Sequence, residues 1–281
     1  MSFLDSFQVN GHTVTMIQYP LSRLNEKSNF LGQKLHHPFK TIKADEEYTI
    51  YDKYKKKDVI KTAKILVYDN DFISEEARND IINSESIMMK HDGSCGYILW
   101  NEKENMFIPY ARYDVKKDDN DDDTFKQPPK NSIACEPQPT NPDATHWPHM
   151  VPCHCDLKAY KWQLHAFQLM IASGKLDQIK SSFTCEYMGK KFNWKSSDPV
   201  NEESVIVPHG LIGFNIPKTL RTIDGFKKIL ETIPFIEGFI IHGKNNIWKI
   251  RRDMFYESDK KKKLEWPNAN SRQLSNFVVL K

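Results

Sequence analysis

The segment Lys90-His91-Asp92-Gly93-Ser94 contains the residue types that point most directly to chemistry. Its lysine follows the apolar residues Ile87-Met88-Met89, which predict a buried strand, and precedes an Asp-Gly pair that favours a tight turn. A primary amine is therefore expected at the mouth of a sheet-lined pocket. Such an amine, desolvated or beside other cations, loses its proton more easily and becomes a nucleophile. Taken alone, the segment is also typical of an ordinary hairpin turn with an exposed lysine.

Charged residues later in the chain follow in an order that suits nucleotidyl transfer. Glu237 lies on a predicted strand and is able to hold a hard cation directly or through water. Lys249 and Arg251 are two residues apart on the next strand, so both point to one face and can grip phosphate oxygens. A five-residue loop, His242 to Asn246, would put Glu237 on that face, whereas a four-residue loop would put it on the opposite face. The chemistry therefore predicts the five-residue loop.

Two more segments extend this set. Arg112 lies on the strand that returns after a polar turn at 101–105, and we expect it roughly opposite Ser94. Glu186 follows on a later strand within Thr184-Cys185-Glu186-Tyr187-Met188-Gly189. Each feature singly also fits a structural role, such as a capping glutamate, a cross-strand ion pair or a solvated basic strand. Their occurrence together in this order is hard to explain in that way.

Short strands and a few helices are expected to position these residues. Ser74 is a favourable N-cap for a helix that runs to about Asn83, because serine and early acidic residues suit a helix start. We expect further helices at 159–173 and 222–232, strands at 87–89, 96–100, 106–113, 182–187, 204–207, 235–241 and 247–251, and irregular loop structure at 114–150. The fold class is α+β, with antiparallel sheets dominating the second half.

Length and composition limit the class of protein. The 281 residues suit two small domains or one large domain with an embellishment, and 39% hydrophobic against 27% charged residues favours a packed core. The sequence shows neither an apolar run of about 18 residues nor a signal peptide, so we expect an intracellular protein, cytoplasmic or nuclear, without a membrane partner. The five cysteines suit reduced thiols. Residues 1–150 carry a net charge of −5 and residues 151–281 a net charge of +8, so the second half is the first guess for a surface that faces a polyanion.

The order of these motifs resembles motifs I, Ia, III, IV and V of the covalent nucleotidyltransferase superfamily of ATP-dependent ligases and mRNA capping enzymes. More closely, the chain resembles the vertebrate-type ATP-dependent 5′-to-3′ RNA ligases. The features that carry this closer match, from about residue 37 to 267, are His37-Pro38-Phe39-Lys40, Lys90-His91-Asp92-Gly93-Ser94-Cys95, Ala111-Arg112, Val207-Pro208-His209-Gly210, Ile236-Glu237-Gly238, Trp248-Lys249 and Trp266-Pro267. Residues 41–86 and 114–145 do not follow the family, and we interpret them as insertions. His91 and Arg251 also depart from its usual residues.

The resemblance implies catalytic roles. Lys90 attacks the α-phosphate of ATP, releases pyrophosphate and forms a lysyl-adenylate. Lys249 and Arg251 neutralise the α-phosphate as charge builds. Glu237 and Asp92 organise Mg²⁺, or Mn²⁺, mostly through its waters. The adenylyl group then passes to the 5′-phosphate of RNA, and the 3′-hydroxyl displaces AMP.

The resemblance also implies how the nucleotide is bound. Glu186 hydrogen-bonds the ribose, Arg112 contacts the ribose or the 5′-phosphate end, and the backbone of Met88 and Met89 meets the adenine edge. The candidates for stacking on the adenine are Val207 and Phe214. The implied partner is RNA with 5′-phosphate and 3′-hydroxyl ends, as in RNA repair, and we expect a monomer.

The expected architecture is an ATP-grasp-like nucleotidyltransferase domain at 86–281, with antiparallel sheets flanked by helices and an irregular insertion at 114–150. Residues 1–85 form an accessory segment, packed on this domain or contiguous with it. Only 30 residues follow Arg251, too few for the OB-fold domain that follows motif V in DNA ligases and capping enzymes. We therefore expect no C-terminal OB-fold, which favours an RNA ligase.

Three alternatives remain open from the sequence. One is an mRNA guanylyltransferase, which would take its label from GTP rather than ATP, and another is a non-catalytic RNA-binding protein on a ligase scaffold. The third is a zinc-dependent binding protein, suggested by Cys135, His146, His149, Cys153, His154 and Cys155, although their spacing fits no familiar zinc module. The run Lys260-Lys261-Lys262-Lys263 is consistent both with RNA contacts and with a solvated basic turn.

Overall fold

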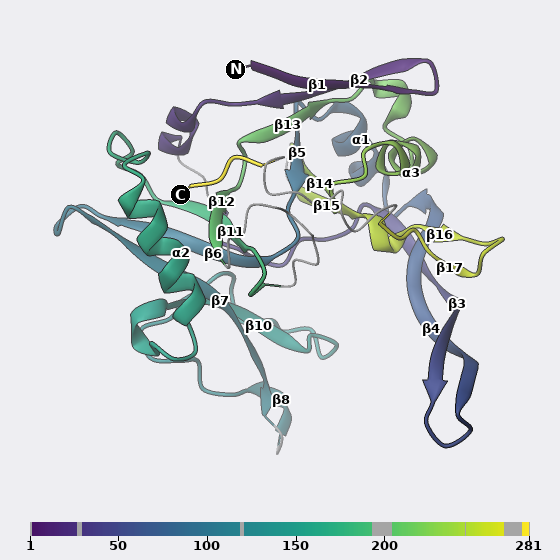
Figure 1. Ribbon diagram of the computed structural model, residues 1–281, viewed down its shortest axis with the longest axis horizontal. Coiled ribbons are helices and arrows are strands. Elements are labelled where there is room, and N and C mark those ends of the chain that lie inside the picture. Colours follow the sequence, from purple (N-terminus) through teal and green to yellow (C-terminus); the bar gives the residue numbers. More distant parts are fainter. Residues whose placement is uncertain are drawn as a thin grey trace.

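The computed structural model describes residues 2–26, 30–118, 121–192, 204–244, 246–266 and 277–280, so Pro267 lies outside the described residues. Two antiparallel sheets form the body of the protein (Figure 1). The first is six-stranded, in the order β1 (Ser2–Val9), β2 (His12–Gln18), β13 (Ile212–Asn215), β5 (Ser86–Lys90), β14 (Gly238–His242), β15 (Ile247–Arg251). The second has the order β12 (Val205–Pro208), β11 (Phe183–Met188), β6 (Ser94–Asn101), β7 (Met106–Asp118), β10 (His146–Pro152), β9 (Ile133–Ala134), with β8 (Asp121–Phe125) pairing to β7.

Three α-helices lie in the described part of the chain: α1 (Glu75–Asn83), α2 (Lys161–Ala172) and α3 (Ile223–Thr232). The N-cap predicted at Ser74 is confirmed, because its side chain accepts a hydrogen bond from the Ala77 N–H, and Thr222 caps α3 in the same way. Gly174, in the left-handed region at φ 64°, follows the end of α2. Short 3₁₀ turns lie at Leu21–Asn25, Cys153–Cys155, Lys218–Leu220 and Arg252–Met254. The α+β class with mainly antiparallel sheets is therefore confirmed, and no described helix is long and apolar enough to cross a bilayer.

Each sheet buries one face against helices. In the first sheet, alternate residues such as Met89 and Phe239 join a core cluster with Phe226 and Ile229 of α3. In the second sheet, residues such as Ile98 and Tyr187 join a cluster with Ala166 and Met170 of α2. Because side chains alternate along a strand, the intervening residues of each sheet point to the other face. We call these other faces the inner faces, and they carry most of the candidate site residues.

Three sequence-based expectations need correction or refinement. Residues 114–150 are not irregular throughout, because β7 continues to Asp118 and pairs with β10 over seven residues. The first 85 residues are contiguous with the rest, because β1 and β2 extend the sheet that holds β5, β14 and β15. The segment after Lys90 is not a hairpin turn, because β5 and β6 belong to different sheets. Residues 91–93 instead cross from one sheet to the other.

A long two-stranded hairpin, β3 (Phe39–Asp52) and β4 (Lys57–Phe72), projects from the body (Figure 1). We call this hairpin the arm. Among the described strands, β3 and β4 pair only with each other, over most of their length. A small second hairpin, β16 (Tyr256–Glu257) and β17 (Lys262–Lys263), lies against its β3 strand.

Candidate active site

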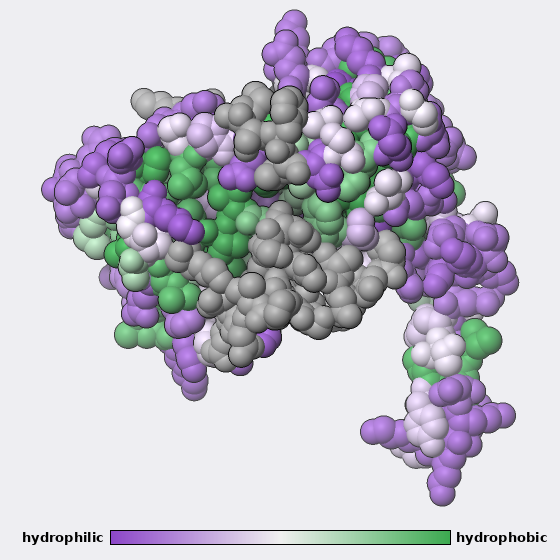
Figure 2. All heavy atoms as spheres, turned by 45° about the horizontal axis from the view of Figure 1, so that its top comes forward, coloured by the Kyte–Doolittle hydropathy of each residue, from purple (hydrophilic) through white to green (hydrophobic). Residues whose placement is uncertain are grey.

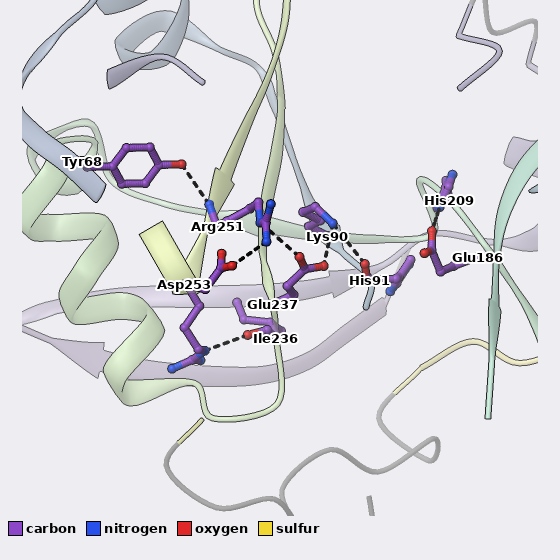
Figure 3. Close-up of polar contacts among 10 residues, drawn as sticks. Tyr68, Lys90, His91, Glu186, His209, Ile236, Glu237, Arg251 and Asp253 are labelled. Carbon is purple, nitrogen blue, oxygen red and sulfur yellow. Dashed lines mark hydrogen bonds and ion pairs between the residues drawn. The ribbon is translucent and has the colours of Figure 1, made fainter. Parts of the chain in front are cut away.

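Lys90 ends β5, near the middle of the first sheet. Gly238 of β14 pairs with Lys90 on one side and with Arg251 of β15 on the other, so these three residues form one row on the inner face. The Lys90 ammonium donates a hydrogen bond to Glu237 Oε2 at 2.5 Å and one to the His91 carbonyl at 3.3 Å (Figure 3). Only 23% of the Lys90 side chain is exposed. The amine therefore points into the molecule rather than into bulk solvent.

Gly93 sets how closely the crossing segment approaches the second sheet. A Cβ atom at this position would lie 2.4 Å from the Tyr187 carbonyl oxygen and 2.8 Å from Glu186 Cγ. Any larger residue would therefore push the segment away from β11. Glycine is required here for close approach, and this contact brings Lys90 near Glu186.

The predicted five-residue hairpin loop is wrong. Ile240 pairs with Lys249 and His242 with Ile247, so four residues, 243–246, close the hairpin. Lys249 and Arg251 do share a face, as expected. Glu237 nevertheless reaches their side of the sheet, because it lies before the first residue of β14 and does not follow the strand alternation.

Arg252 explains how Glu237 is held outside the strand. Its backbone N–H donates to the Glu237 carbonyl at 2.8 Å, and its buried guanidinium donates to the carbonyls of Ile236 at 3.1 Å and Ile233 at 2.8 Å. These bonds fix the chain between the end of α3 and β14. The Glu237 carboxylate is thereby directed at Lys90 and Arg251. In the sequence, the only sign of this positioning role for Arg252 is that it directly follows Arg251.

Besides Glu237, Arg251 contacts Asp253 and Tyr68, which the sequence analysis did not identify as site residues. Its guanidinium lies 3.5 Å from Glu237 Oε1 and 2.5 Å from Asp253 Oδ2, and its backbone N–H donates to the Tyr68 hydroxyl at 3.1 Å (Figure 3). Tyr68 is also 2.6 Å from His37 Nδ1. Tyr68 belongs to β4, distant in sequence from β15, so only the fold brings it to the site.

The expected loss of the Lys90 proton is not what the surrounding charges favour. Burial opposes the charged amine, but the negative charges of Glu237 and Glu186 and the hydrogen bond to Glu237 outweigh it and raise the pKa of Lys90. Burial also raises the pKa of Glu237, while Lys90 acts in the opposite direction. The pair therefore holds the amine in its charged form. A reaction at Lys90 requires that this ion pair be broken.

Lys249 has the opposite electrostatic setting. Burial, followed by the charges of Arg251, Lys90, Lys34 and Arg112, lowers the pKa of Lys249 to about 8. None of the ion pairs found among the described residues involves its ammonium. A desolvated cation facing other cations is a strong site for an anion, because a bound phosphate would relieve the repulsion.

The second sheet contributes Glu186 and Arg112 on its inner face. Glu186 is buried on β11 opposite Cys95, and its carboxylate is 3.1 Å from His209 Nε2. The His209 ring stacks on His91, with centroids 5.8 Å apart. Arg112 donates to the Gly32 carbonyl at 2.9 Å and pairs with Asp114 at 3.0 Å. Since Gly96 pairs with Ala111, Arg112 lies opposite Cys95, one residue from the expected Ser94.

The residues expected around adenine divide between the two faces. Met88 lies on the inner face beside Gly213, where a Cβ atom would come within 2.9 Å of the Tyr19 ring. Met89 faces the helices and belongs to the core. Phe214 also faces the helices and packs edge-to-face on Phe239, so it is not available for stacking. The inner-face residues are Met88 and Val207, and both are buried.

The candidate metal ligands are two carboxylates. Asp92 lies close enough to Glu237 for its charge to raise the pKa of that carboxyl group. Mg²⁺ is usually held by one or two carboxylates together with substrate phosphates, so this pair fits a metal that arrives with a triphosphate. In the described chain, no group of three or more His, Cys, Asp or Glu side chains is placed to hold a metal. The Cys/His cluster at 135–155, all of it described, contributes no such group.

The site thus gathers charged groups from both sheets: Lys90, Asp92, Arg112, Glu186, Glu237, Lys249 and Arg251. Comparisons with protein-family models, with curated proteins and with solved structures find no match to this chain. Any function assigned to it rests on the chemistry that these groups support.

Proposed function

We propose that this protein is an ATP-dependent RNA ligase that joins a 5′-phosphate to a 3′-hydroxyl through a covalent adenylate on Lys90. The observation that carries the proposal is that a half-buried amine, a half-buried carboxylate and a half-buried lysine with no ion pair among the described residues meet on one face. Lys90, Glu237 and Lys249 come from three neighbouring strands or their ends. This arrangement supplies a nucleophile, a proton acceptor and a phosphate-binding cation within one site.

In the first step, Lys90 Nζ forms a bond to the α-phosphorus of ATP. The bond from that phosphorus to the bridging oxygen breaks, and pyrophosphate leaves with the electron pair. The amine must first give up a proton, and Glu237 Oε2, 2.5 Å away, is placed to receive it. Burial already raises the pKa of Glu237, which suits this carboxylate to act as a base.

Positive groups stabilise the charge that builds on the α-phosphate. Lys249 and Arg251 project from β15 on the side of Lys90, two residues apart. They are fixed before the reaction by the sheet and, for Arg251, by Glu237 and Asp253. Preorganised cations of this kind act on the transition state without reorganisation cost. Asp92 and Glu237 would hold a magnesium ion, which would supply further neutralisation of the phosphate charge.

The second and third steps transfer the adenylyl group and seal the strand. An oxygen of the RNA 5′-phosphate attacks the α-phosphorus, the bond from phosphorus to Lys90 Nζ breaks, and the amine regains its proton. The RNA 3′-hydroxyl then loses its proton to water and its oxygen bonds to the 5′-phosphorus; the bond from that phosphorus to the oxygen shared with the adenylyl group breaks, and AMP leaves with the electron pair. Glu186 and Arg112, on the facing sheet, are placed to hold the ribose and the 5′-phosphate end in these steps.

The test is intact-mass spectrometry of the full chain after incubation with ATP and Mg²⁺ or Mn²⁺. We expect a mass increase of one AMP that disappears in Lys90→Ala and persists in a control, Lys158→Ala, which changes an exposed lysine. An adduct of GMP from GTP instead would indicate a guanylyltransferase. The absence of any adduct with either nucleotide and either metal would reject the proposal.

A sealing assay tests the RNA steps separately. RNA with a 5′-phosphate and a 3′-hydroxyl should be joined, whereas RNA with a 5′-hydroxyl should not. The protein that already carries AMP should seal without added ATP. An adduct that forms on Lys90 but never passes to RNA would retain the nucleotidyl transfer and reject RNA as the acceptor.

A further inference from the structure

The arm is rooted firmly at one end. Phe39 and Tyr68 meet edge-to-face at 5.2 Å, and Tyr68 contacts Phe255 at 5.0 Å. Phe39 also lies 6.4 Å from Phe226 of α3, so the root belongs to the main core. The Tyr68 hydroxyl accepts a hydrogen bond from the backbone N–H of Arg251. The arm therefore starts beside the candidate active site.

The β16–β17 hairpin contacts the β3 strand of the arm at residues 45–47, between its root and its tip. The Glu47 N–H donates to the Lys261 carbonyl at 3.1 Å, and the Tyr256 hydroxyl donates to the Asp45 carbonyl at 2.5 Å. Three lysines of the 260–263 run are ion-paired: Lys260 with Glu257, Lys261 with Glu47 and Lys262 with Glu265. The Lys261–Glu47 pair joins this run to the arm, and the other two pairs lie within residues 257–265. These three ammonium groups therefore already have carboxylate partners, which favours a structural role over the RNA contacts that the composition also allowed.

The tip of the arm is different. It carries four exposed lysines, for which the structure gives no ion pair with any described residue: Lys53, Lys55, Lys56 and Lys57. Tyr54 is 99% exposed and Tyr51 61% exposed. Residues 51–64 hold six lysines against two aspartates, a net charge of +4 within the acidic half of the chain. Figure 2 shows this hydrophilic tip standing well away from the body.

We propose that the arm tip binds single-stranded RNA, and that it holds a substrate strand whose end lies at Lys90. Unpaired lysines attract phosphates, and exposed tyrosines provide faces on which bases stack without sequence preference. The choice of RNA rests on the proposed function, whereas the position of the binding surface does not. The paired residues Thr41–Tyr68 and Asp52–Lys57 are eleven positions apart, roughly 36 Å at about 3.3 Å per residue. Only an RNA strand long enough to span this distance would contact both the arm tip and the candidate active site.

The experiment measures binding of fluorescent single-stranded RNA, about 30 or about 5 nucleotides long, as a function of salt. The tip variant replaces the four tip lysines with glutamine. We expect its affinity for the long RNA to fall at least about tenfold, and the slope of log K against log salt to fall by up to about 3, because each phosphate contact contributes about 0.7 on single strands. Affinity for the short RNA at the site should change little. A second variant, Tyr51→Ala with Tyr54→Ala, should weaken binding of the long RNA and keep the salt slope.

A matched control removes four other exposed lysines, also to glutamine: Lys103, Lys130, Lys158 and Lys244. Equal losses in the control and the tip variant would show a general charge effect and overturn the proposal. The proposal would also be overturned if the tip variant bound RNA as tightly as the wild type. The same holds if the tip variant lost binding to phosphatidylserine vesicles but kept its RNA binding. AMP adduct formation on Lys90 should stay normal in the tip variant. If the wild type forms no adduct, the proposed function fails, but the RNA-binding result still decides on the arm.

Discussion

The candidate active site and the arm tip both gather cations, but their surroundings differ. In the site, Lys90 lies 2.5 Å from Glu237, and burial with neighbouring charges lowers the pKa of Lys249 to about 8. At the tip, Lys55 and Lys56 are exposed, and no ion pair to a described residue holds them. Buried charges interact strongly, whereas exposed ones are screened by water and salt. A single substitution in the site should therefore change the rate of AMP adduct formation. A single tip lysine should change RNA affinity only slightly, and the four tip lysines together should change it strongly.

Composition alone did not distinguish these two regions. The second half of the chain has a net charge of +8, yet three lysines of its densest basic run are paired with glutamates. The first half is acidic overall and still presents the unpaired basic tip. What matters for a polyanion is which cations remain unpaired after folding.

The largest effect is expected from Glu237→Ala. This change removes the carboxylate between Lys90 and Arg251, so Lys90 loses its proton acceptor and the largest cause of its raised pKa. We expect AMP adduct formation to slow by about 100-fold or more, in the range found when one preorganised group is removed from a site. The measurement is the rate of adduct formation followed by intact mass. A plot of this rate against pH should shift to lower pH in the variant.

The control for that experiment is Glu231→Ala, which removes a partly exposed surface carboxylate paired with lysines of α3. Exposed pairs of this kind contribute at most about 1 kcal/mol. Its rate should match the wild type. If Glu237→Ala retained the full rate, adduct formation would not depend on the Glu237 carboxylate. The expected difference between charged groups in the site and charged groups on the surface would then be wrong.

The next effect concerns Lys249 and has a defined pH dependence. A pKa of about 8 in the folded protein, against 10.5 for a free lysine, means that the unfolded chain binds more protons between these values. Stability therefore rises with pH in this window, and the charged form costs on the order of 1–3 kcal/mol below pH 8. Lys249→Met should raise Tm at pH 7 while it weakens ATP binding about tenfold. A variant that lost binding and stability together would show a structural role instead.

The same pKa predicts how ATP binding depends on pH. The wild type should bind ATP more weakly as pH rises through about 8, because Lys249 then loses its charge. Lys249→Arg keeps its charge and should show a flatter profile. The two profiles are compared by calorimetry in the same buffers. Equal slopes would assign the titration to another group.

The sequence predicted local features well because short-range chemistry determines them. Ser74 caps its helix as expected, and Lys249 and Arg251 share a face because the period of a strand is two. The residue types alone also indicate Lys90 and Glu237, which lie 2.5 Å apart in the structure. These features depend on residues a few positions apart.

The errors came from long-range contacts that no local pattern encodes. Glu237 was assigned to a strand, but Arg252 holds its backbone just outside β14 through carbonyls of the preceding loop. The raised pKa of Lys90 depends on partners almost 100 or more positions away in the sequence. Phe214 was a candidate for stacking until the register of β13 placed it on the helix-covered face. In each case the missing information was which elements become neighbours.

The smallest effect is expected at Tyr68, the residue that joins the two regions. Its ring belongs to the aromatic root of the arm, and its hydroxyl accepts the Arg251 N–H at 3.1 Å. Tyr68→Phe keeps the ring and removes the hydroxyl, so the hydrogen bonds to the Arg251 N–H and to His37 Nδ1 are lost, each contributing about 1 kcal/mol. Because the aromatic packing remains, the arm should keep its position and long RNA should bind as in the wild type. Adduct formation should slow a few-fold, since the backbone of β15 is held less tightly. If instead RNA binding fell and adduct formation stayed normal, the hydroxyl would be serving the arm rather than the site.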